Sequence, residues 1–338
     1  MRLILLGLGV VGKAFLELLE LERKDLYSKY GLNPTLVAAA DSRAVVINPR
    51  GLDMGELLRY KRGKGSLKGH RFEGNMGVKD LLREIEAEVV IDATPSDFKT
   101  GEPGLSYIKA ALLSDKHIIT ANKGPLALEM PALIDMFNHK GLKLLFSGTV
   151  GGGTPFLRFV GKCLSGERIL SIRGVINGTT NYVLNRMEDG LSFDAALKEA
   201  QEKGYAEADP SNDIDGWDSA AKLVILSNWA MDSGATIKDV SVRGIRGIEL
   251  TDELLSRGKT IRLIATADDS GLRVQPEEID RKDPLVVPDA LNAVSFTAEI
   301  SGRHTLIGKG AGGKETAAAL LRDLVELKMY LGGAGTCW

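Results

Sequence analysis

Residues 3–21 read LILLGLGVVGKAFLELLEL and predict a strand, a glycine turn and a helix in direct succession. Residues 3–6 form a short apolar run, and apolar residues recur at helical spacing after the turn. Between them, Gly7, Gly9 and Gly12 match G-x-G-x-x-G. There the first glycine permits a tight turn, the second lets the backbone approach a pyrophosphate, and the third lets the helix pack closely on the strand. The stretch predicts a dinucleotide site at the helix N-terminus, against the alternative of a glycine turn without a ligand.

The succession of strand and helix continues to about residue 150. The runs TLVAAAD, AEVVIDAT, KHIITAN and LKLLFSG read as strands, and residues 104–113 and 126–138 read as helices. Because strands that alternate with helices favour a parallel sheet covered on both faces, we predict an α/β domain over residues 1–150 with a Rossmann-type, doubly wound parallel sheet. The basic, glycine-rich segment 49–74 is interpreted as a long loop.

A different pattern follows. Helical stretches at residues 154–163, 177–188, 193–203 and 217–231 mix with the β-rich runs RILSIRGVI, IRLIATAD, LRVQPEEI and AVSFTAEIS. We therefore predict a second, α+β domain over residues 151–309. The last segment, 310–332, is a glycine turn that leads into an Ala/Leu helix, and we expect this helix to complete the first domain.

The composition favours a small-molecule ligand. The 338 residues include 43 Lys and Arg against 45 Asp and Glu, so the charge carries no sign of binding to nucleic acid or to a membrane surface. No apolar run is long enough to span a bilayer. Two cysteines, Cys163 and Cys337, cannot form a disulfide framework, and the four histidines show no zinc spacing. We expect a cytoplasmic protein without a catalytic metal.

The choice between NAD and NADP stays open at this point. Asp41 ends the second predicted strand, where an acid accepts hydrogen bonds from a ribose 2′-hydroxyl and favours NAD. It lies later than the usual spacing after the glycine motif. Arg43 follows closely, and Arg50, Lys61 and Arg62 lie in the predicted loop. Any of these cations can meet a 2′-phosphate and favour NADP, and all of them can equally be solvated surface charges.

Two lysines are candidates for proton transfer. Lys222 lies in the apolar run AAKLVIL with Asp218 four residues earlier on the same helical face, so it can form an ion pair or act on a ligand. An EF-hand reading of the preceding acidic stretch fails because Lys222 occupies the position of the bidentate Glu. The carboxylates around it suit a cationic group such as an amino acid's ammonium. Lys123 follows a strand at the edge where open α/β sheets bind ligands, although an ordinary loop lysine would look the same.

The chain resembles homoserine dehydrogenases over essentially its whole length. The motifs that carry the resemblance are, in order, GLGVVG, TANKGPLA, TVGGGTP, GVINGTTNY, GYAEADPSNDIDGWDSAAK and GKGAGGKETA. The resemblance implies NAD- or NADP-linked interconversion of L-aspartate 4-semialdehyde and L-homoserine, a step toward threonine, methionine and isoleucine. It also implies a homodimer whose second domain provides the substrate site and the subunit contact.

The same resemblance assigns residue roles. It implies that Lys222 is the catalytic acid/base and that Lys123 lies near the nicotinamide and the substrate. It implies that Glu207, Asp218 and Asp213 hold the substrate. The positions that match the family's cofactor contacts are Gly7, Gly9, Val10, Val11, Gly12, Thr94 and Gly312, together with Lys123. Asp41 and Arg43 are further candidates for cofactor binding, because of their place after the second predicted strand.

A sodium ion is the other implied ligand. Val150, Gly152 and Thr154 match the family's cation-binding positions, whereas Ser147 stands where the family commonly has Glu. We also expect a monofunctional chain without the C-terminal regulatory domain that many relatives carry.

Two rival functions fit these residues less well. A dehydrogenase that forms a thiohemiacetal needs an activated cysteine, and Cys163 has no histidine near it in the sequence. A non-catalytic dinucleotide sensor would not need the proton-transferring lysines.

Overall fold

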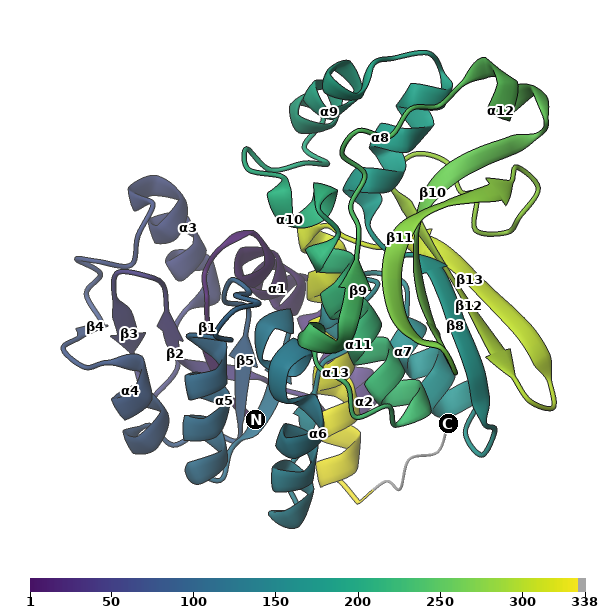
Figure 1. Ribbon diagram of the computed structural model, residues 1–338. Helices are drawn as coiled ribbons and strands as arrows, with labels where there is room; N and C mark the ends of the chain where they lie inside the picture. Colours follow the sequence, from purple (N-terminus) through teal and green to yellow (C-terminus); the bar gives the residue numbers. More distant parts are fainter. Residues whose placement is uncertain (334–338) are drawn as a thin grey trace. The chain divides into compact units, whose positions relative to one another are not determined.

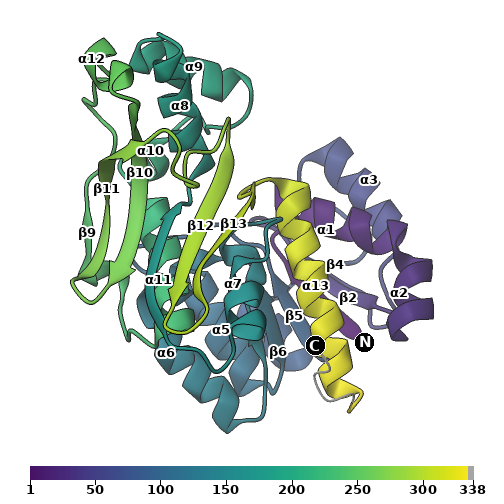
Figure 2. The ribbon, with the colours of Figure 1, turned by 90° about the vertical axis from the view of Figure 1, so that its right-hand side faces the viewer.

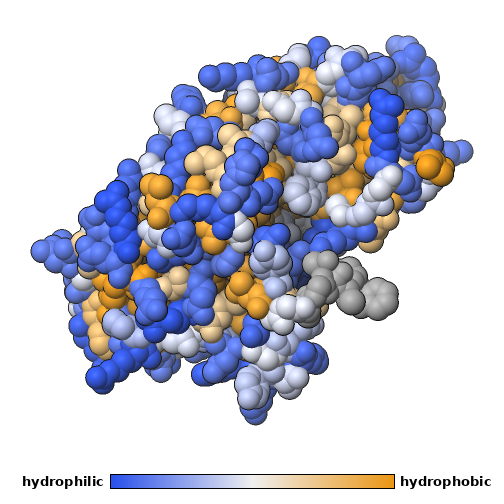
Figure 3. All heavy atoms as spheres, turned by 90° about the horizontal axis from the view of Figure 1, so that it is seen from below, coloured by the Kyte–Doolittle hydropathy of each residue, from blue (hydrophilic) through white to orange (hydrophobic). Residues whose placement is uncertain are grey.

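A computed structural model of the protein describes residues 1–333, so Cys337 lies outside the described part. The chain forms two compact units (Figure 1). One comprises Met1–Thr149 with the segment that begins at Gly312, and the other comprises Val150–Ala311. Within residues 1–333 no helix has the length and apolar character that a membrane crossing requires. Hydrophilic side chains cover most of the face shown in Figure 3, with hydrophobic ones in small groups between them.

A seven-stranded sheet forms the centre of the first unit. Its strands are β1 (Arg2–Leu6), β2 (Thr35–Ala40), β3 (Val45–Ile47), β4 (Glu73–Gly74), β5 (Val89–Asp92), β6 (His117–Thr120) and β7 (Leu144–Leu145). In the order β4-β3-β2-β1-β5-β6-β7, the five strands from β2 to β7 pair in parallel, and β3 and the edge strand β4 are added antiparallel. The predicted fold class is confirmed, and the sheet is mixed at one edge.

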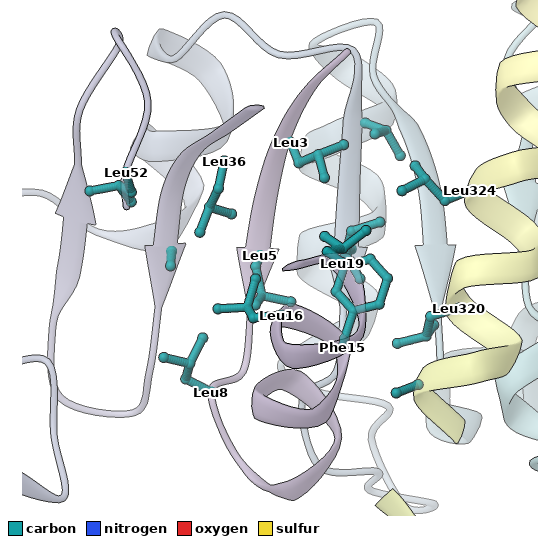
Figure 4. Close-up of a cluster of buried hydrophobic side chains, with 14 of the residues drawn as sticks. Leu3, Leu5, Leu8, Phe15, Leu16, Leu19, Leu36, Leu52, Leu320 and Leu324 are labelled. Atoms are coloured by element: carbon teal, nitrogen blue, oxygen red, sulfur yellow. The ribbon is translucent and has the colours of Figure 1, made fainter. Parts of the chain in front are cut away.

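Helices cover both faces of this sheet (Figures 1 and 2). They are α1 (Val10–Leu21), α2 (Arg23–Tyr30), α3 (Met54–Lys64), α4 (Val78–Glu84), α5 (Gly104–Leu113), α6 (Lys123–His139), the 3-10 turn η1 (Ser147–Thr149) and α13 (Gly313–Leu331). Alternate side chains of β1 pack against α1 and α13. Leu3 and Leu5 of β1 meet Phe15 of α1 and Leu320 and Leu324 of α13 in one buried cluster (Figure 4). The burial of this apolar surface holds the C-terminal helix against the first sheet.

The segment 49–74, predicted as a loop, contains the helix α3. α3 begins after Asp53, whose carboxylate accepts a hydrogen bond from Glu56 N at 2.7 Å, and it ends at Gly65 with φ 69°. A side-chain cap at the start and a left-handed glycine at the end are strong helix boundaries. Leu57 and Leu58 anchor the helix as its buried residues. The glycines and basic residues of this segment favoured a loop, although Met54, Leu57 and Leu58 stand at the helical spacing i, i+3 and i+4.

The second unit combines helices with a six-stranded sheet of order β13-β12-β8-β10-β11-β9. The strands are β8 (Ile169–Val175), β9 (Val240–Val242), β10 (Lys259–Asp268), β11 (Gly271–Asp280), β12 (Leu291–Ala298) and β13 (Gly302–Lys309). The helices are α7 (Phe156–Arg158), the π-helix η2 (Phe159–Cys163), α8 (Gly178–Glu188), α9 (Phe193–Glu202), α10 (Ser211–Ile214), α11 (Trp217–Met231), the 3-10 turn η3 (Ile237–Asp239) and α12 (Asp252–Ser256). All pairs in this sheet are antiparallel except β9 with β11.

Candidate functional site

The glycine turn of the first unit requires glycine for steric reasons. A Cβ at Gly7, where φ is 91°, would lie 2.5 Å from Ala93 O, and a Cβ at Gly12 would lie 1.9 Å from Gly7 O. Neither position tolerates a side chain. Gly9 differs, because a Cβ there would meet no atom within 4 Å. Its backbone therefore faces open space, as the approach of a pyrophosphate requires.

Two helices of the first unit begin at this turn. α1 follows Gly9 and α13 follows Gly312, and neither helix has a side-chain cap at its N-terminus. A Cβ at Gly313 would lie 2.5 Å from Val10 Cγ1, so the two helix starts adjoin. Val10 is 71% exposed and Val11 is partly buried. Helix N-termini attract anions through their N–H groups and dipoles, so the residues present fit a dinucleotide pyrophosphate.

Asp41, just beyond β2, already has four hydrogen-bond donors. Its Oδ1 accepts from Arg43 N and Ala44 N, and its Oδ2 accepts from Leu67 N and from the ammonium of Lys61. The side chain is only 4% exposed. Burial raises the pKa of this carboxyl, but the bonds from Lys61 and the backbone outweigh burial and the pKa lies below its ordinary value. Since a carboxylate has about four lone-pair sites, Asp41 has little capacity left for a ribose hydroxyl.

The remaining loop cations differ in their surroundings. Arg43 is exposed, and so is Arg50. Arg62 forms an ion pair with Glu17 of α1. Arg43 is therefore an exposed cation two residues beyond the buried carboxylate of Asp41.

A buried carboxylate ties together the strand ends that carry Thr94 and Lys123. Asp92 Oδ1 accepts from Thr94 Oγ1 at 2.6 Å, and its Oδ2 accepts from Thr120 Oγ1 at 3.0 Å. Asn122 Nδ2 in turn donates to Thr94 Oγ1 at 3.0 Å, and its Oδ1 caps α6, which begins at Lys123. Burial raises the pKa of Asp92, and the bonds from Thr94 and Thr120 act in the opposite direction. This network sets the position of Lys123, which is partly buried.

Lys222 lies within α11 of the second unit, and its side chain is 7% exposed. Its ammonium lies 2.6 Å from Asp218 Oδ2, one helical turn earlier, and donates to Ile176 O at 2.8 Å. α11 begins after Gly216, whose φ of 90° turns the chain into the helix. An ammonium has three N–H donors. With two acceptors described within residues 1–333, one N–H of Lys222 is available to a ligand.

Three further side chains, Asn177, Asp213 and Thr179, join Lys222 and Asp218 in one cluster. Asn177 Nδ2 donates to Asp213 Oδ1 at 2.6 Å and to Asp218 Oδ2 at 3.0 Å. Thr179 Oγ1 lies 3.0 Å from Asp213 Oδ2 and 2.7 Å from Tyr205 O. Burial, with the nearby charge of Asp218, raises the pKa of Asp213. The cluster thus holds the carboxylates of Asp213 and Asp218 close together, and neighbouring carboxylates suit a cationic ligand group.

Glu207 is less closely engaged with the cluster. It lies in the turn between α9 and α10 with an exposed side chain, and its main-chain oxygen accepts from Gln201 Nε2 at 3.2 Å. The same turn is held near Asp213 by Thr179, which bonds to Tyr205 O. The structure thus brings together Lys222, Asp218 and Asp213, while Glu207 lies on the connecting turn.

The predicted cation positions lie in two segments that carry hydrogen bonds of their own. Ser147 N donates to Asp323 Oδ2 at 2.8 Å in the first unit. In the second unit, Thr154 Oγ1 donates to Lys309 O at 3.1 Å, and Thr154 O accepts from Phe156 N. Val150 is buried, and Gly152 adopts φ 46°. Each carbonyl has two lone pairs, so these bonds leave room for a cation at Thr154 O.

Three polar residues of these clusters were missed from the sequence: Asp92, Asn122 and Asn177. Each follows or ends an apolar strand, in VVIDAT, IITANKG and RGVINGTT respectively. A polar residue at the end of a buried run was the available signal, because burial of such a group is costly without partners. Cys163, the residue that the thiohemiacetal rival requires, is an exposed free cysteine in η2.

Comparison with known proteins points to one family. The sequence profile of the family described as homoserine dehydrogenase matches residues 155–325. A homoserine dehydrogenase of Methanocaldococcus jannaschii is 40% identical over 97% of this chain and 98% of that protein. A protein of Pseudomonas canavaninivorans, described as an NAD(+)-dependent homoserine dehydrogenase, is 36% identical over 96% of each chain.

Solved structures of similar fold belong to the same family. A homoserine dehydrogenase from Thiobacillus denitrificans matches with a TM-score of 0.84 and 30% identity, over all of this chain and 75% of that one. A hyperthermophilic archaeal homoserine dehydrogenase in complex with NADPH matches with a TM-score of 0.85 and 26% identity, over 97% and 98% of the two chains.

Proposed function

Because this chain belongs to the homoserine dehydrogenase family and is thereby an NAD(P)-dependent oxidoreductase, we propose that it interconverts L-homoserine and L-aspartate 4-semialdehyde. The observation that carries this proposal is the buried cluster of Lys222, Asp218 and Asp213. The cluster combines a buried ammonium, which can donate a proton, with two carboxylates of the second unit. An amino acid with an alcohol or aldehyde side chain presents the two complementary groups, an ammonium and a reacting oxygen.

Lys222 acts as the general acid and base in the proposed mechanism. The bound nicotinamide cofactor supplies a hydride in the reduction and accepts one in the oxidation. When the aldehyde carbon gains hydride, its oxygen becomes an alkoxide, and the free N–H of the Lys222 ammonium stabilises and then protonates it. In the oxidation, neutral Lys222 removes the hydroxyl proton as hydride leaves the carbon. Ile176 O and Asp218 hold Nζ in place for both directions.

The carboxylates bind the substrate ammonium. Asp213 and Asp218 are the two partly buried acids of the cluster, and Glu207 lies on the turn beside it. The two carboxylates lie close together, so the positive charge of the substrate ammonium is attracted to the cluster. A 2-hydroxy or 2-keto acid of the same size lacks this charge and is discriminated against.

Lys123 is proposed as a second cation near the nicotinamide and the substrate. Its support is the rigid anchoring of its backbone: Lys123 N donates to Ser96 Oγ at 2.9 Å, and Asn122 links this segment to Thr94. A lysine at the start of α6, at the carboxyl edge of a parallel sheet, lies where such sheets bind ligands.

NADP is the proposed preferred cofactor. The carboxylate of Asp41, which would otherwise accept a ribose 2′-hydroxyl, is occupied by four donors, one of them Lys61. Arg43, exposed beside it, can pair with a 2′-phosphate. The first unit, with the glycine turn and α13, would bind this cofactor, and the unit Val150–Ala311 would bind the amino acid.

The remaining expectations stay predictions. A role in threonine, methionine and isoleucine synthesis follows from the proposed reaction. A homodimer formed through the second unit is checked by light scattering. A sodium ion at Val150, Gly152 and Thr154 is checked by replacing sodium with a large organic cation. A cytoplasmic location is checked by cell fractionation.

The decisive experiment measures initial rates of L-homoserine oxidation at the nicotinamide absorbance. NAD and NADP are compared in parallel, with sodium, with potassium and without either ion. We expect turnover with both cofactors and a higher kcat/KM with NADP. Folded protein that binds NADPH yet oxidises no homoserine would refute the proposed function and favour the sensor.

A further inference from the structure

We propose that Asn177 is a positioning residue of the homoserine reaction: its amide holds Asp213 and Asp218 in the arrangement that aims Lys222 at the substrate. This inference rests on the proposed function. It concerns a residue in the connection between β8 and α8, far in sequence from the helix that carries Lys222.

The amide of Asn177 is used completely by this arrangement. Its two N–H groups go to different acids, 2.6 Å to Asp213 Oδ1 and 3.0 Å to Asp218 Oδ2. Its oxygen accepts from Thr180 N at 2.9 Å and caps α8. Because the cap fixes the side chain to the rigid start of a helix, the two N–H groups have fixed directions. The residue is 3% exposed, so water does not compete for these bonds.

The two carboxylates need this donor for electrostatic reasons. Both are partly buried, and each makes the ionised form of the other less favourable. Lys222 neutralises one charge through its contact with Asp218 at 2.6 Å. Asn177 is the donor common to both acids, so it reduces their mutual repulsion and keeps Asp213 from approaching the ammonium. Without Asn177, we expect both acids to compete for the Lys222 ammonium. The N–H that would face the substrate would then point elsewhere.

The neighbouring residue supports the same interpretation. Ile176, directly before Asn177, accepts a hydrogen bond from Lys222 Nζ through its main-chain oxygen. Two consecutive residues at the end of β8 thus fix both members of the ion pair, one through its backbone and the other through its side chain. A rigid support of this kind is what precise proton transfer requires.

Two substitutions separate positioning from helix capping. Asn177→Ser retains a good N-cap, but its single hydroxyl proton cannot serve both acids. Asn177→Asp also retains the cap and nearly the same shape, but it replaces the NH₂ group by one oxygen that faces both acids. Ser192→Ala is the matched control, because Ser192 caps α9 through Ala195 N and contacts neither acid. All three variants and the wild type are assayed for homoserine oxidation, NADPH binding and thermal unfolding.

We expect kcat of Asn177→Ser to fall by about 100-fold, the effect of a misplacement near 1 Å, with a smaller change in KM. The kcat of Asn177→Asp should fall at least as far at neutral pH. Its activity relative to the wild type should then rise as the pH falls, because the new carboxyl has a raised pKa among acids and donates a hydrogen bond once protonated. Ser192→Ala should lose stability and keep its kcat, and NADPH binding should be unchanged throughout.

Two results would overturn the inference. If Asn177→Ser has the wild-type kcat and pH profile, Asn177 is only a helix cap. This variant also decides the question if Asn177→Asp does not fold. If wild type and Ser192→Ala both bind NADPH but oxidise no homoserine, the proposed function fails and the inference fails with it. If wild type and Ser192→Ala oxidise homoserine and Asn177→Ser has the wild-type kcat, only the positioning role is refuted.

Discussion

Replacement of Lys222 by Met tests the proposed chemistry most directly. Met has a similar chain length and no charge, so it fills the space within α11 and removes the ammonium. General acid/base catalysis contributes about 10²–10⁴-fold, which is about 2.7–5.5 kcal/mol at 1.36 kcal/mol per decade. We expect kcat in both directions to fall within this range, while NADPH binding, which depends on the glycine turn of the first unit, is unchanged.

The same change has a calculable effect on stability. Asp218 is 13% exposed on its side chain and would lose the ammonium 2.6 Å away. Removal of one partner of a buried pair costs about 3–5 kcal/mol. Asn177 still donates to Asp218, and the carboxyl can take up a proton, so we expect a loss near the lower end of this range. The double variant Lys222→Met/Asp218→Asn also removes the charge of Asp218, and it should recover stability without recovering activity.

Stopped-flow measurement of nicotinamide absorbance gives the hydride-transfer step, and urea unfolding gives the free energy of unfolding. A kcat of Lys222→Met within threefold of the wild type would refute the assignment. A raised KM with unchanged kcat would make Lys222 a substrate anchor. Recovery of activity in the double variant would show that the single variant failed through instability rather than through loss of the proton donor.

Three further predictions concern other parts of the molecule. Gly12→Ala places a methyl group 1.9 Å from a backbone oxygen, so the glycine turn must shift at a cost of about 1–3 kcal/mol. We expect the shifted turn to weaken NADPH binding about tenfold or more, as measured by fluorescence titration. Glu188→Gln should lower the free energy of unfolding in urea by about 3–5 kcal/mol and spare kcat, because it leaves the fully buried Arg262 without its counter-ion. Hydrogen bonds, first of all from Lys203, lower the pKa of Glu199 from 4.5 to about 2, so its stabilising effect is present above pH 4.5 and is lost as the pH falls toward 2. The melting temperature of Glu199→Gln should therefore lie below that of the wild type at neutral pH and converge with it over that interval.

The sequence predicts long, strongly patterned elements well. The helix Gly104–Leu113 and the helix Trp217–Met231 have the predicted bounds, since both have continuous apolar content between clear breaks. β13, at residues Gly302–Lys309, was missed because its side chains alternate only weakly between exposed and half-buried. The helix predicted over residues 154–163 is a short α-helix followed by the π-helix Phe159–Cys163, a change of hydrogen bonding that periodicity does not reveal.

The candidate site was predictable in part because of local spacing. Asp218 and Lys222 are four residues apart on a helix, so their ion pair follows from the sequence, and the structure has it at 2.6 Å. Asp41 forms its bonds with Lys61 and Leu67, 20 and 26 residues away, and Asn177 meets Asp213 and Asp218 at separations of 36 and 41. Partners that distant depend on the path of the whole chain, and spacing contains no information about them.

The polar residues at strand ends show why reactive and supporting groups look alike in a sequence. Asp92 and Lys222 are both charged residues in apolar runs, and both are buried. The carboxylate of Asp92 accepts bonds from Thr94 and Thr120, which hold it in place between two strand ends. The ammonium of Lys222 has two described acceptors for three donors, and it shares its cluster with the carboxylates of Asp213 and Asp218. A buried group held by short bonds between two strand ends serves as support, whereas a buried ammonium with a donor left over beside carboxylates can bind a ligand and transfer a proton. These partners distinguish the two residues, and they are known only from the three-dimensional structure.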